Sequence, residues 1–256
     1  MAAMDLGLRD RVYLITGGSR GLGLATAQAL AADGAKVVLS ARDAAAVADA
    51  AAGLGGPGHA VGITADNADP EAAARLLAAS REAFGRLDGV LISVGGPPGG
   101  GTEAVGDDAW RAAFESVFLG AVRLGRLAGA ELGEGGSIAF VLSSSVRSPI
   151  PALAISNGLR PGLAGVAKTM ADELGPRGIR VNGLLPGRIA TGRVRWLDGR
   201  SGDPDEVRAR LSTAIPLQRY GEPEEFGKVA AFVLSPAASY LTGQMITVDG
   251  GAQRAI

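Results

Sequence analysis

The chain of 256 residues is long enough to form one large α/β domain whose core needs no disulfide or metal ion to stabilise it. Its 25 basic and 26 acidic residues give a formal net charge of -1 without any basic block, so nothing favours a nucleic acid or an anionic membrane as partner. The absence of cysteine excludes a disulfide scaffold, a thiolate nucleophile and a cysteine-ligated metal.

The N-terminal segment, 1–11, carries charged residues where a signal peptide needs an apolar core. No apolar run farther along approaches the length that spans a bilayer. We therefore expect a soluble, cytoplasmic protein that forms a single domain over residues 1–256.

Short β-rich runs alternate with longer helical patterns, which predicts a doubly wound parallel sheet of the Rossmann type, with helices on both faces. The predicted strands are 12–16, 36–40, 60–64, 89–94, 137–142, 180–185 and 245–248. The predicted helices are 22–32, 43–52, 70–84, 107–132, 152–174 and 223–234.

Two stretches interrupt the alternation, and both follow a predicted strand. Segment 95–101 reads G-G-P-P-G-G-G, which cannot be regular structure. Segment 188–217 contains one predicted short helix, 204–213, and is long enough to form a small substrate lobe. Both should lie at the carboxyl edge of the sheet, where open α/β sheets bind their ligands.

The segment 16–23 reads T-G-G-S-R-G-L-G and joins an apolar run to a helical pattern, as in a dinucleotide-binding turn. Gly17 permits a sharp turn, Gly21 lets the backbone approach a pyrophosphate, and Gly23 lets the helix close onto the sheet. The glycine spacing is G-x-x-x-G-x-G rather than G-x-G-x-x-G. The alternative is an ordinary turn between a strand and a helix in a chain rich in glycine, so the rest of the chain must decide.

Two later motifs occur in the right order and at the right distances: G-I-R-V-N-G-L-L-P-G at 178–187 and Y-L-T-G-Q-M-I-T-V-D-G-G at 240–251. With the glycine turn, they make the chain resemble the short-chain dehydrogenase/reductase family, and more closely its β-ketoacyl-carrier-protein-reductase-like branch. The resemblance covers essentially the whole chain. It implies a fold that binds a nicotinamide cofactor.

The resemblance also implies cofactor contacts. Segment 19–23 would line the phosphates, Asp66 and Asn67 the adenine, and the segments around 186 and 191 the nicotinamide and pyrophosphate. The full predicted set is Gly17, Ser19, Arg20, Gly21, Leu22, Gly23, Asp66, Asn67, Gly95, Pro186, Gly187, Ile189 and Thr191.

The end of the second predicted strand bears on the choice of dinucleotide. A site that selects NAD needs a carboxylate there for the ribose hydroxyls, whereas an NADP site needs a cation for the 2′-phosphate. The acidic position holds Ala41, Arg42 follows it, and Arg20 could approach the same phosphate. We therefore predict NADP(H); the alternative is that both arginines are simply solvated.

The family's chemistry uses a Tyr phenol as proton donor, a Lys four residues on that lowers its pKa, and a Ser that orients the substrate oxygen. Alignment of 162–168 with the family's helix puts Ser156 at the Tyr position, Arg160 at the Lys position and Ser143 on the Ser. A serine hydroxyl titrates far above a phenol, and an arginine keeps its charge but cannot hand on a proton. The resemblance thus implies an atypical active site in which Arg160 clamps the cofactor ribose.

The surroundings of this site depart from the family pattern as well. Val117 stands where the family often has an Asn that anchors a water molecule, and 92–95 reads I-S-V-G in place of N-N-A-G. These changes are consistent with a retuned pocket. They are also consistent with neutral drift in a protein that binds NADP(H) without turning it over.

The leading hypothesis is an NADP(H)-dependent oxidoreductase that acts on a carbonyl or related small-molecule substrate through Ser143, assisted by Ser156 and a water molecule. The alternatives are a non-redox pseudoenzyme or sensor, and an isomerase or lyase on the same fold. The resemblance further implies a homo-oligomer, a tetramer or at least a dimer, assembled through helices 107–132 and 152–174.

Other candidates carry weaker signals. The only histidine, His59, is predicted at the surface, away from the ligand edge, and no residues have metal-ligand spacing. Tyr13 and Tyr240 lie in or beside predicted strands and are expected to pack in the core. Tyr220, near the lobe, is an alternative phenol.

Two arginines follow predicted strands at the ligand edge. Arg147 comes after the fifth strand and Arg188 after the sixth. Either could hold an anionic group of the substrate, although solvated arginines are more common.

Overall fold

Seven parallel strands form one sheet in the order β3-β2-β1-β4-β5-β6-β7, in a computed structural model that describes residues 5–254. This order confirms the predicted doubly wound fold. The strands are β1 (Val12–Thr16), β2 (Lys36–Ala41), β3 (Ala60–Thr64), β4 (Gly89–Ile92), β5 (Ser137–Val141), β6 (Arg180–Pro186) and β7 (Met245–Val248).

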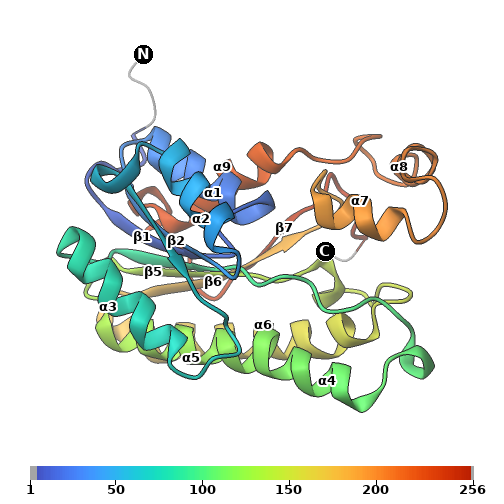
Figure 1. Cartoon of the computed structure of the whole chain (residues 1–256), viewed down its shortest axis with the longest axis horizontal. Helices are drawn as coiled ribbons and strands as arrows, with labels where there is room; N and C mark the ends of the chain where they lie inside the picture. Colours follow the sequence, from blue (N-terminus) through green and yellow to red (C-terminus); the bar gives the residue numbers. More distant parts are fainter. Residues whose placement is uncertain (1–4, 255–256) are drawn as a thin grey trace.

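Helices cover both faces of this sheet, with α1, α2 and α9 on one face and α3, α5 and α6 on the other (Figure 1). The helices are α1 (Gly21–Ala32), α2 (Ala44–Gly53), α3 (Ala72–Phe84), α4 (Asp107–Ala113), α5 (Gly120–Glu131), α6 (Ala154–Leu174), α7 (Gly192–Asp198), α8 (Pro204–Ser212) and α9 (Pro223–Leu234). No helix within residues 5–254 combines the length and the apolar character needed to cross a membrane.

The central strands are buried because both of their faces are covered. All five residues of β1 are buried. Leu14 packs toward α3 and α5, whereas its neighbours Tyr13 and Ile15 pack toward α1 and α9.

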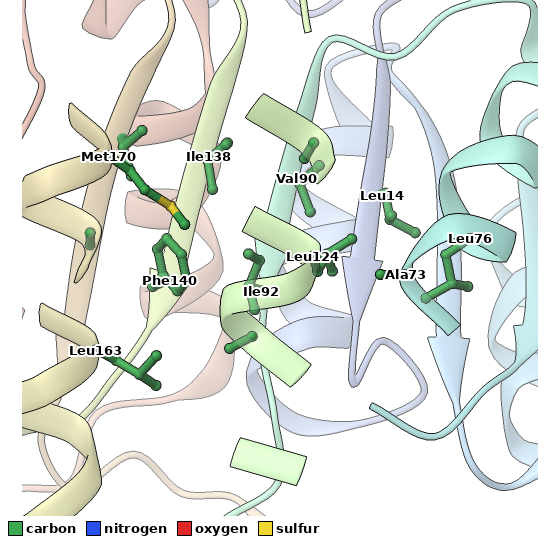
Figure 2. Packing of buried hydrophobic residues seen from close by; sticks show 14 of the residues in the cluster. Leu14, Ala73, Leu76, Val90, Ile92, Leu124, Ile138, Phe140, Leu163 and Met170 are labelled. Atoms are coloured by element: carbon green, nitrogen blue, oxygen red, sulfur yellow. The ribbon is translucent and has the colours of Figure 1, made fainter. Parts of the chain in front are cut away.

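Figure 2 shows the first of these two cores, where leucines and methionine of the helices meet the sheet. Leu76 of α3, Leu124 of α5 and Leu163 of α6 are all buried. Each such side chain stabilises the fold by about 1.5–3 kcal/mol relative to an exposed one. The sheet contributes Leu14, Val90, Ile92, Ile138 and Phe140.

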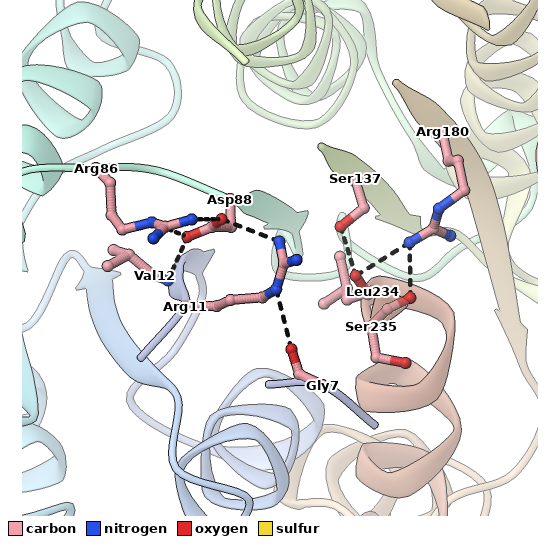
Figure 3. A network of polar contacts seen from close by, with 9 residues as sticks. All are labelled: Gly7, Arg11, Val12, Arg86, Asp88, Ser137, Arg180, Leu234 and Ser235. Carbon is pink, nitrogen blue, oxygen red and sulfur yellow. Dashed lines mark hydrogen bonds and ion pairs between the residues drawn. The ribbon is translucent and has the colours of Figure 1, made fainter. Parts of the chain in front are cut away.

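The amino edge of the sheet carries paired charges (Figure 3). The buried Asp88 carboxylate accepts from Arg11 at 3.1 Å, from Arg86 at 2.6 Å and from the Val12 N–H at 2.8 Å. These contacts hold the chain segments that lead into β1 and β4 side by side.

The last turn of α9 is fixed to the same edge. Arg180 donates to the carbonyl oxygens of Val233 at 2.7 Å and Ser235 at 2.9 Å, and the Ser137 hydroxyl donates to that of Leu234 at 2.7 Å. Carbonyl groups at a helix C-terminus lack partners within the helix, so these side chains satisfy them. The amino edge is therefore a structural edge, which leaves the carboxyl edge for ligands.

Two of the departures from the predicted elements have a clear physical cause. The strand predicted at 89–94 stops at Ile92, because the Thr16 hydroxyl both accepts from the Ser93 N–H and donates to the Ser93 carbonyl, each at 2.9 Å. The single helix predicted at 107–132 is divided by a π-helical segment, Phe114–Leu119. Within that segment the Ser116 hydroxyl donates to the Ala112 carbonyl, a bond that competes with regular helix geometry.

Candidate active site

A cleft of about 1670 Å³ opens where the strands end at their carboxyl termini. It is larger than the 300–1,000 Å³ of typical small-ligand pockets, so it has room for a dinucleotide and a substrate together. Residues predicted from distant parts of the chain line this one cleft. They are Gly17, Ser19, Arg20, Gly21, Leu22, Gly23, Arg42, Asp66, Asn67, Gly95, Ser143, Ser156, Arg160, Pro186, Gly187, Ile189 and Thr191.

The turn between β1 and α1 is tight enough to require glycine. A Cβ atom at Gly17, whose φ is +60°, would lie 2.6 Å from the Ser93 carbonyl oxygen, and one at Gly23 would lie 2.3 Å from that of Gly17. No side chain caps α1 at its N-cap residue, Arg20, within the described residues. The first N–H groups of α1 are therefore free for an anion in the cleft, as a dinucleotide pyrophosphate requires.

Two exposed arginines flank the end of β2, where the adenosine end of a dinucleotide would lie. Neither Arg20 nor Arg42 forms an ion pair with any residue in 5–254. The nearby Asp43 carboxylate is engaged elsewhere, because it accepts from the Ala46 N–H at 3.0 Å and caps α2. The charges available at this point are positive and suit a phosphate group.

Three serines lie where β5 ends and α6 begins. The Ser143 Oγ accepts from the Ser145 N–H at 3.1 Å, which leaves the Ser143 hydroxyl hydrogen free to donate into the cleft. Ser156, buried in the first turn of α6, has its Oγ 3.4 Å from the Ser145 Oγ, a long contact for two hydroxyl groups.

Arg160 lies one turn farther along α6 and is 4% exposed. It donates to the carbonyl oxygens of Val141 at 2.7 Å and Val94 at 3.3 Å, at the ends of β5 and β4. Burial lowers the pKa of its guanidinium to about 10, and the charge of Arg193 acts in the same direction. The group remains a cation at neutral pH, with no carboxylate partner among residues 5–254.

After β6 the chain forms α7 and α8, which make up one side of the cleft. Ile189 pairs with Gly221 in a short parallel bridge, and the Thr191 hydroxyl oxygen accepts from the Val194 N–H at 3.3 Å and caps α7. Helix α7 was not predicted from the sequence. It places Trp196 and Leu197 in the wall of the cleft.

Tyr220 and Arg188 are bound to each other and to a buried aspartate. Arg188 donates to Asp198 at 2.6 Å and to the Tyr220 hydroxyl at 3.1 Å, and that hydroxyl donates to the other Asp198 oxygen at 3.0 Å. Burial raises the pKa of the Tyr220 phenol, which is 1% exposed and does not line the cleft. The alternative in which Tyr220 supplies a phenol is therefore wrong, and the Arg188 charge is already neutralised.

Several weaker predictions are also settled. His59 is exposed, as predicted, and Tyr13 is buried in the core, where burial raises the pKa of its phenol to about 12. The prediction that Tyr240 packs in the core is wrong. It is fully exposed because it belongs to the turn before β7 rather than to a strand. Arg147 is exposed and lies outside the cleft lining.

Two residues of the site were missed from the sequence. Ser145 links the predicted serines, and the serine run at 143–145 was a signal that it shares their position. Arg193 lines the cleft from α7. No sequence pattern around Arg193 indicated this, because its position depends on how α7 folds back over the edge of the sheet.

The chain matches the family model described as enoyl-(acyl carrier protein) reductase over residues 17–253. It is 35% identical to an uncharacterized oxidoreductase of Methylorubrum extorquens, over 96% of this chain and 99% of that protein.

Solved structures agree with this match. A short-chain dehydrogenase/reductase, described as glucose/ribitol dehydrogenase, from Brucella melitensis superposes with a TM-score of 0.91 at 30% identity, over 98% of this chain and 100% of that one. The structure of L-sorbose reductase from Gluconobacter frateurii, complexed with NADPH and L-sorbose, also superposes with a TM-score of 0.91. Its sequence is 29% identical, and the superposition covers 99% of this chain and 100% of that one. The chain belongs to the short-chain dehydrogenase/reductase family.

Proposed function

We propose that the protein is an NADP(H)-dependent oxidoreductase that acts on a carbonyl or related unsaturated compound through an atypical active site. One observation carries this proposal: the glycine turn, the arginines beside β2 and the serines beside α6 all line a single cleft. A site that holds a dinucleotide and a substrate together needs this proximity.

The chain's own residues fit a dinucleotide phosphate better than a ribose diol at the end of β2. Arg20 and Arg42 offer two guanidinium groups, Ala41 has no carboxylate, and Asp43 is occupied in capping α2. The NADPH complex of L-sorbose reductase, a protein of the same fold, supports the same choice. When bound, the nicotinamide supplies or accepts the hydride.

Ser143 is the group best placed to hold the reacting oxygen. Its own oxygen already accepts from the Ser145 N–H, and its hydrogen remains available for a substrate oxygen in the cleft, which supports this role. Arg160 sits at the same end of the cleft with a permanent charge, which supports a role in holding the cofactor ribose. Ser156 lies between them in the sequence and completes the proposed set of groups.

The test combines turnover with binding. NADPH oxidation is measured across a panel of ketones, 3-oxoacyl thioesters and unsaturated acyl thioesters, beside calorimetric titration of NADPH and of NADH. We expect the protein to bind NADPH and to reduce at least one of these three classes of compound. The thioesters test the proposed likeness to β-ketoacyl-carrier-protein reductases.

A second function is favoured by one specific observation. No tyrosine lines the cleft among the described residues, so the usual proton donor of the family is missing. A non-redox pseudoenzyme or sensor would bind NADPH with the same residues and show no turnover with any compound of the panel. An isomerase or lyase would convert substrate without net NADPH oxidation.

The proposal also covers the domain organisation, the cellular location and the assembly of the protein. We infer that the chain acts as a single domain, with residues 188–217 as the substrate lobe, in the cytoplasm. The proposed assembly is a homotetramer.

A further inference from the structure

Arg193 is a cation of the cleft that the proposed function leaves without a role. It extends from the first turn of α7 across the cleft, where its Nη2 donates to the Pro97 carbonyl oxygen at 2.5 Å. Its Nε lies against the backbone of Gly96, because a Cβ there would be 2.8 Å away. Arg160 donates to the Val94 carbonyl of the same loop. Two guanidinium groups thus converge on one short segment, 94–97.

These two cations have no counter-ion among residues 5–254. All the arginine ion pairs of the described chain involve other arginines, including Arg188 with Asp198 and Arg195 with Asp205 on the same lobe. Arg193 is half-buried and repels Arg160, and burial, followed by the charge of Arg200, lowers its pKa. A cation so placed is costly unless an anion joins it.

The shape around Arg193 restricts what that anion is attached to. Arg193 stacks over the Trp196 ring, 4.5 Å from its centroid, which fixes the plane of the guanidinium. Apolar side chains from both sides of the cleft line the same cavity as Arg193. They include Pro98, Ile150, Leu153, Leu197 and Ile215. The cleft therefore contains a guanidinium whose plane is fixed, a set of apolar side chains and the Ser143 hydroxyl.

We propose that the substrate is an amphiphilic anion: a compound whose carbonyl reaches Ser143, whose chain lies on the apolar walls, and whose carboxylate or phosphate binds Arg193. This inference rests on the proposed function for the carbonyl and on the charge and packing of Arg193 for the anion. A planar guanidinium already oriented by a ring receives such a group with two parallel hydrogen bonds.

The cofactor pyrophosphate is the competing partner for Arg193. Thr191, two residues before it, lies over the start of α1, since a Cβ at Gly21 would be 3.5 Å from the Thr191 methyl group. Arg193, however, bonds to the loop after β4 rather than to the turn after β1. This position favours the substrate as its partner, and the experiment separates the two.

The experiment uses the full chain, with and without NADPH, and compares 4-oxooctanoate with 4-oxooctanamide, which have the same carbon chain and nearly the same shape but differ in charge. Calorimetry on the wild-type protein should give an affinity about 10-fold higher for the carboxylate, the effect of one charge-assisted contact. Arg193→Gln should remove this preference, and Arg193→Lys should keep part of it. The affinity for NADPH should stay within about twofold in both variants. Inorganic phosphate, titrated in parallel, shows whether the site accepts a phosphate as well.

Arg200→Gln is the matched control, because Arg200 stacks on the same Trp196 ring but does not line the cleft. It should retain the wild-type preference. The proposal is overturned if the wild-type protein does not prefer the carboxylate, including the case in which neither compound binds, or if Arg193→Gln keeps the preference. A loss of NADPH affinity in Arg193→Gln, with carboxylate binding unchanged, assigns the residue to the cofactor and also overturns it. Preference for the carboxylate without turnover of any carbonyl compound defeats the proposed function and leaves the anion site standing.

Discussion

The Oγ atoms of Ser145 and Ser156 lie 3.4 Å apart, and the N–H of the same Ser145 donates to Ser143 at 3.1 Å. Ser145 therefore connects the two serines assigned to the chemistry, although it does not line the cleft itself. The Ser145 N–H restrains the Ser143 oxygen and leaves the Ser143 hydroxyl hydrogen available to a ligand.

Replacement of Ser143 tests its assignment directly. Ser143→Ala should lower turnover by about 10² or more on a confirmed substrate, since groups that orient and protonate a reacting oxygen typically contribute that much. Calorimetric affinity for NADPH should be nearly unchanged. Ser148→Ala, at an exposed serine outside the cleft, is the control. Full activity of Ser143→Ala would refute the role given to this residue.

Selection of the dinucleotide should depend on Arg42. The wild-type protein should bind NADPH on the order of 10-fold or more tightly than NADH, as expected when a charge-assisted contact contributes about 1.5–3 kcal/mol. Arg42→Ala should reduce this ratio by weakening NADPH binding alone. Arg126→Ala, at an exposed arginine of α5 away from the cleft, should leave both affinities as they are. Equal wild-type affinities would contradict the prediction.

The proposed replacement of the family's Tyr and Lys by Ser156 and Arg160 can be tested at the start of α6. Ser156→Tyr combined with Arg160→Lys supplies a phenol at the cleft and a cation that lowers its pKa, so reduction of simple ketones should appear or rise. The rate of NADPH oxidation measures the gain, and each single variant shows whether both changes are needed. A double variant that folds and binds NADPH but gains no ketone reduction would show that other departures, such as Val117, limit the chemistry.

Acid should weaken the start of α9 through Glu225. Two hydrogen bonds from Arg219, each at 2.7 Å, and one from the Glu222 N–H lower the pKa of this carboxyl from 4.5 to about 2. A carboxyl whose pKa is lower in the folded state adds stability above about pH 4.5, and that stability is lost as the pH falls through about 2. When the free energy of unfolding is measured with denaturant between pH 4.5 and pH 2, it should fall less steeply with decreasing pH for Glu225→Gln than for the wild type. Glu224→Gln, on the same turn without an ion pair among residues 5–254, should follow the wild type.

Assembly should depend on an aromatic pair of the outer helical layer. Phe114 is 43% exposed and stacks on Phe118, with ring centroids 5.2 Å apart, and Phe118 in turn covers Gly162 of α6. Light scattering at micromolar concentration should give the mass of a tetramer, and Phe114→Glu should give a smaller species with unchanged circular dichroism. A wild-type monomer would count decisively against the proposed assembly.

The strands were predictable because each is a short apolar run between helical patterns, and such runs arise when helices cover both faces of a sheet. The position of the candidate site was also predictable, because parallel strands bring the residues that follow their carboxyl ends to one edge of the sheet. Gly17, Ser93 and Ser143 thus meet although more than a hundred residues separate the first from the last.

The features that could not be predicted from the sequence depend on tertiary contacts. The end of β4 at Ile92 results from the Thr16 hydroxyl, which is on another strand. The burial of Tyr220 requires Asp198 of a helix, α7, that the sequence did not indicate. The carbonyl partners of Arg160 likewise lie elsewhere in the fold, at Val141, the last residue of β5, and at Val94, in the loop after β4.

The arginines of the cleft have a consequence for the speed of binding. Arg20, Arg42, Arg160 and Arg193 line it without an ion pair among residues 5–254, whereas the only carboxylates in its lining are those of Asp43 and Asp66, on a chain whose net charge is -1. The mouth is thus a local positive field on a molecule that is otherwise nearly neutral, and such a field steers anions toward it during diffusion. The association rate of NADPH should therefore fall as ionic strength rises, while that of an uncharged carbonyl compound should not.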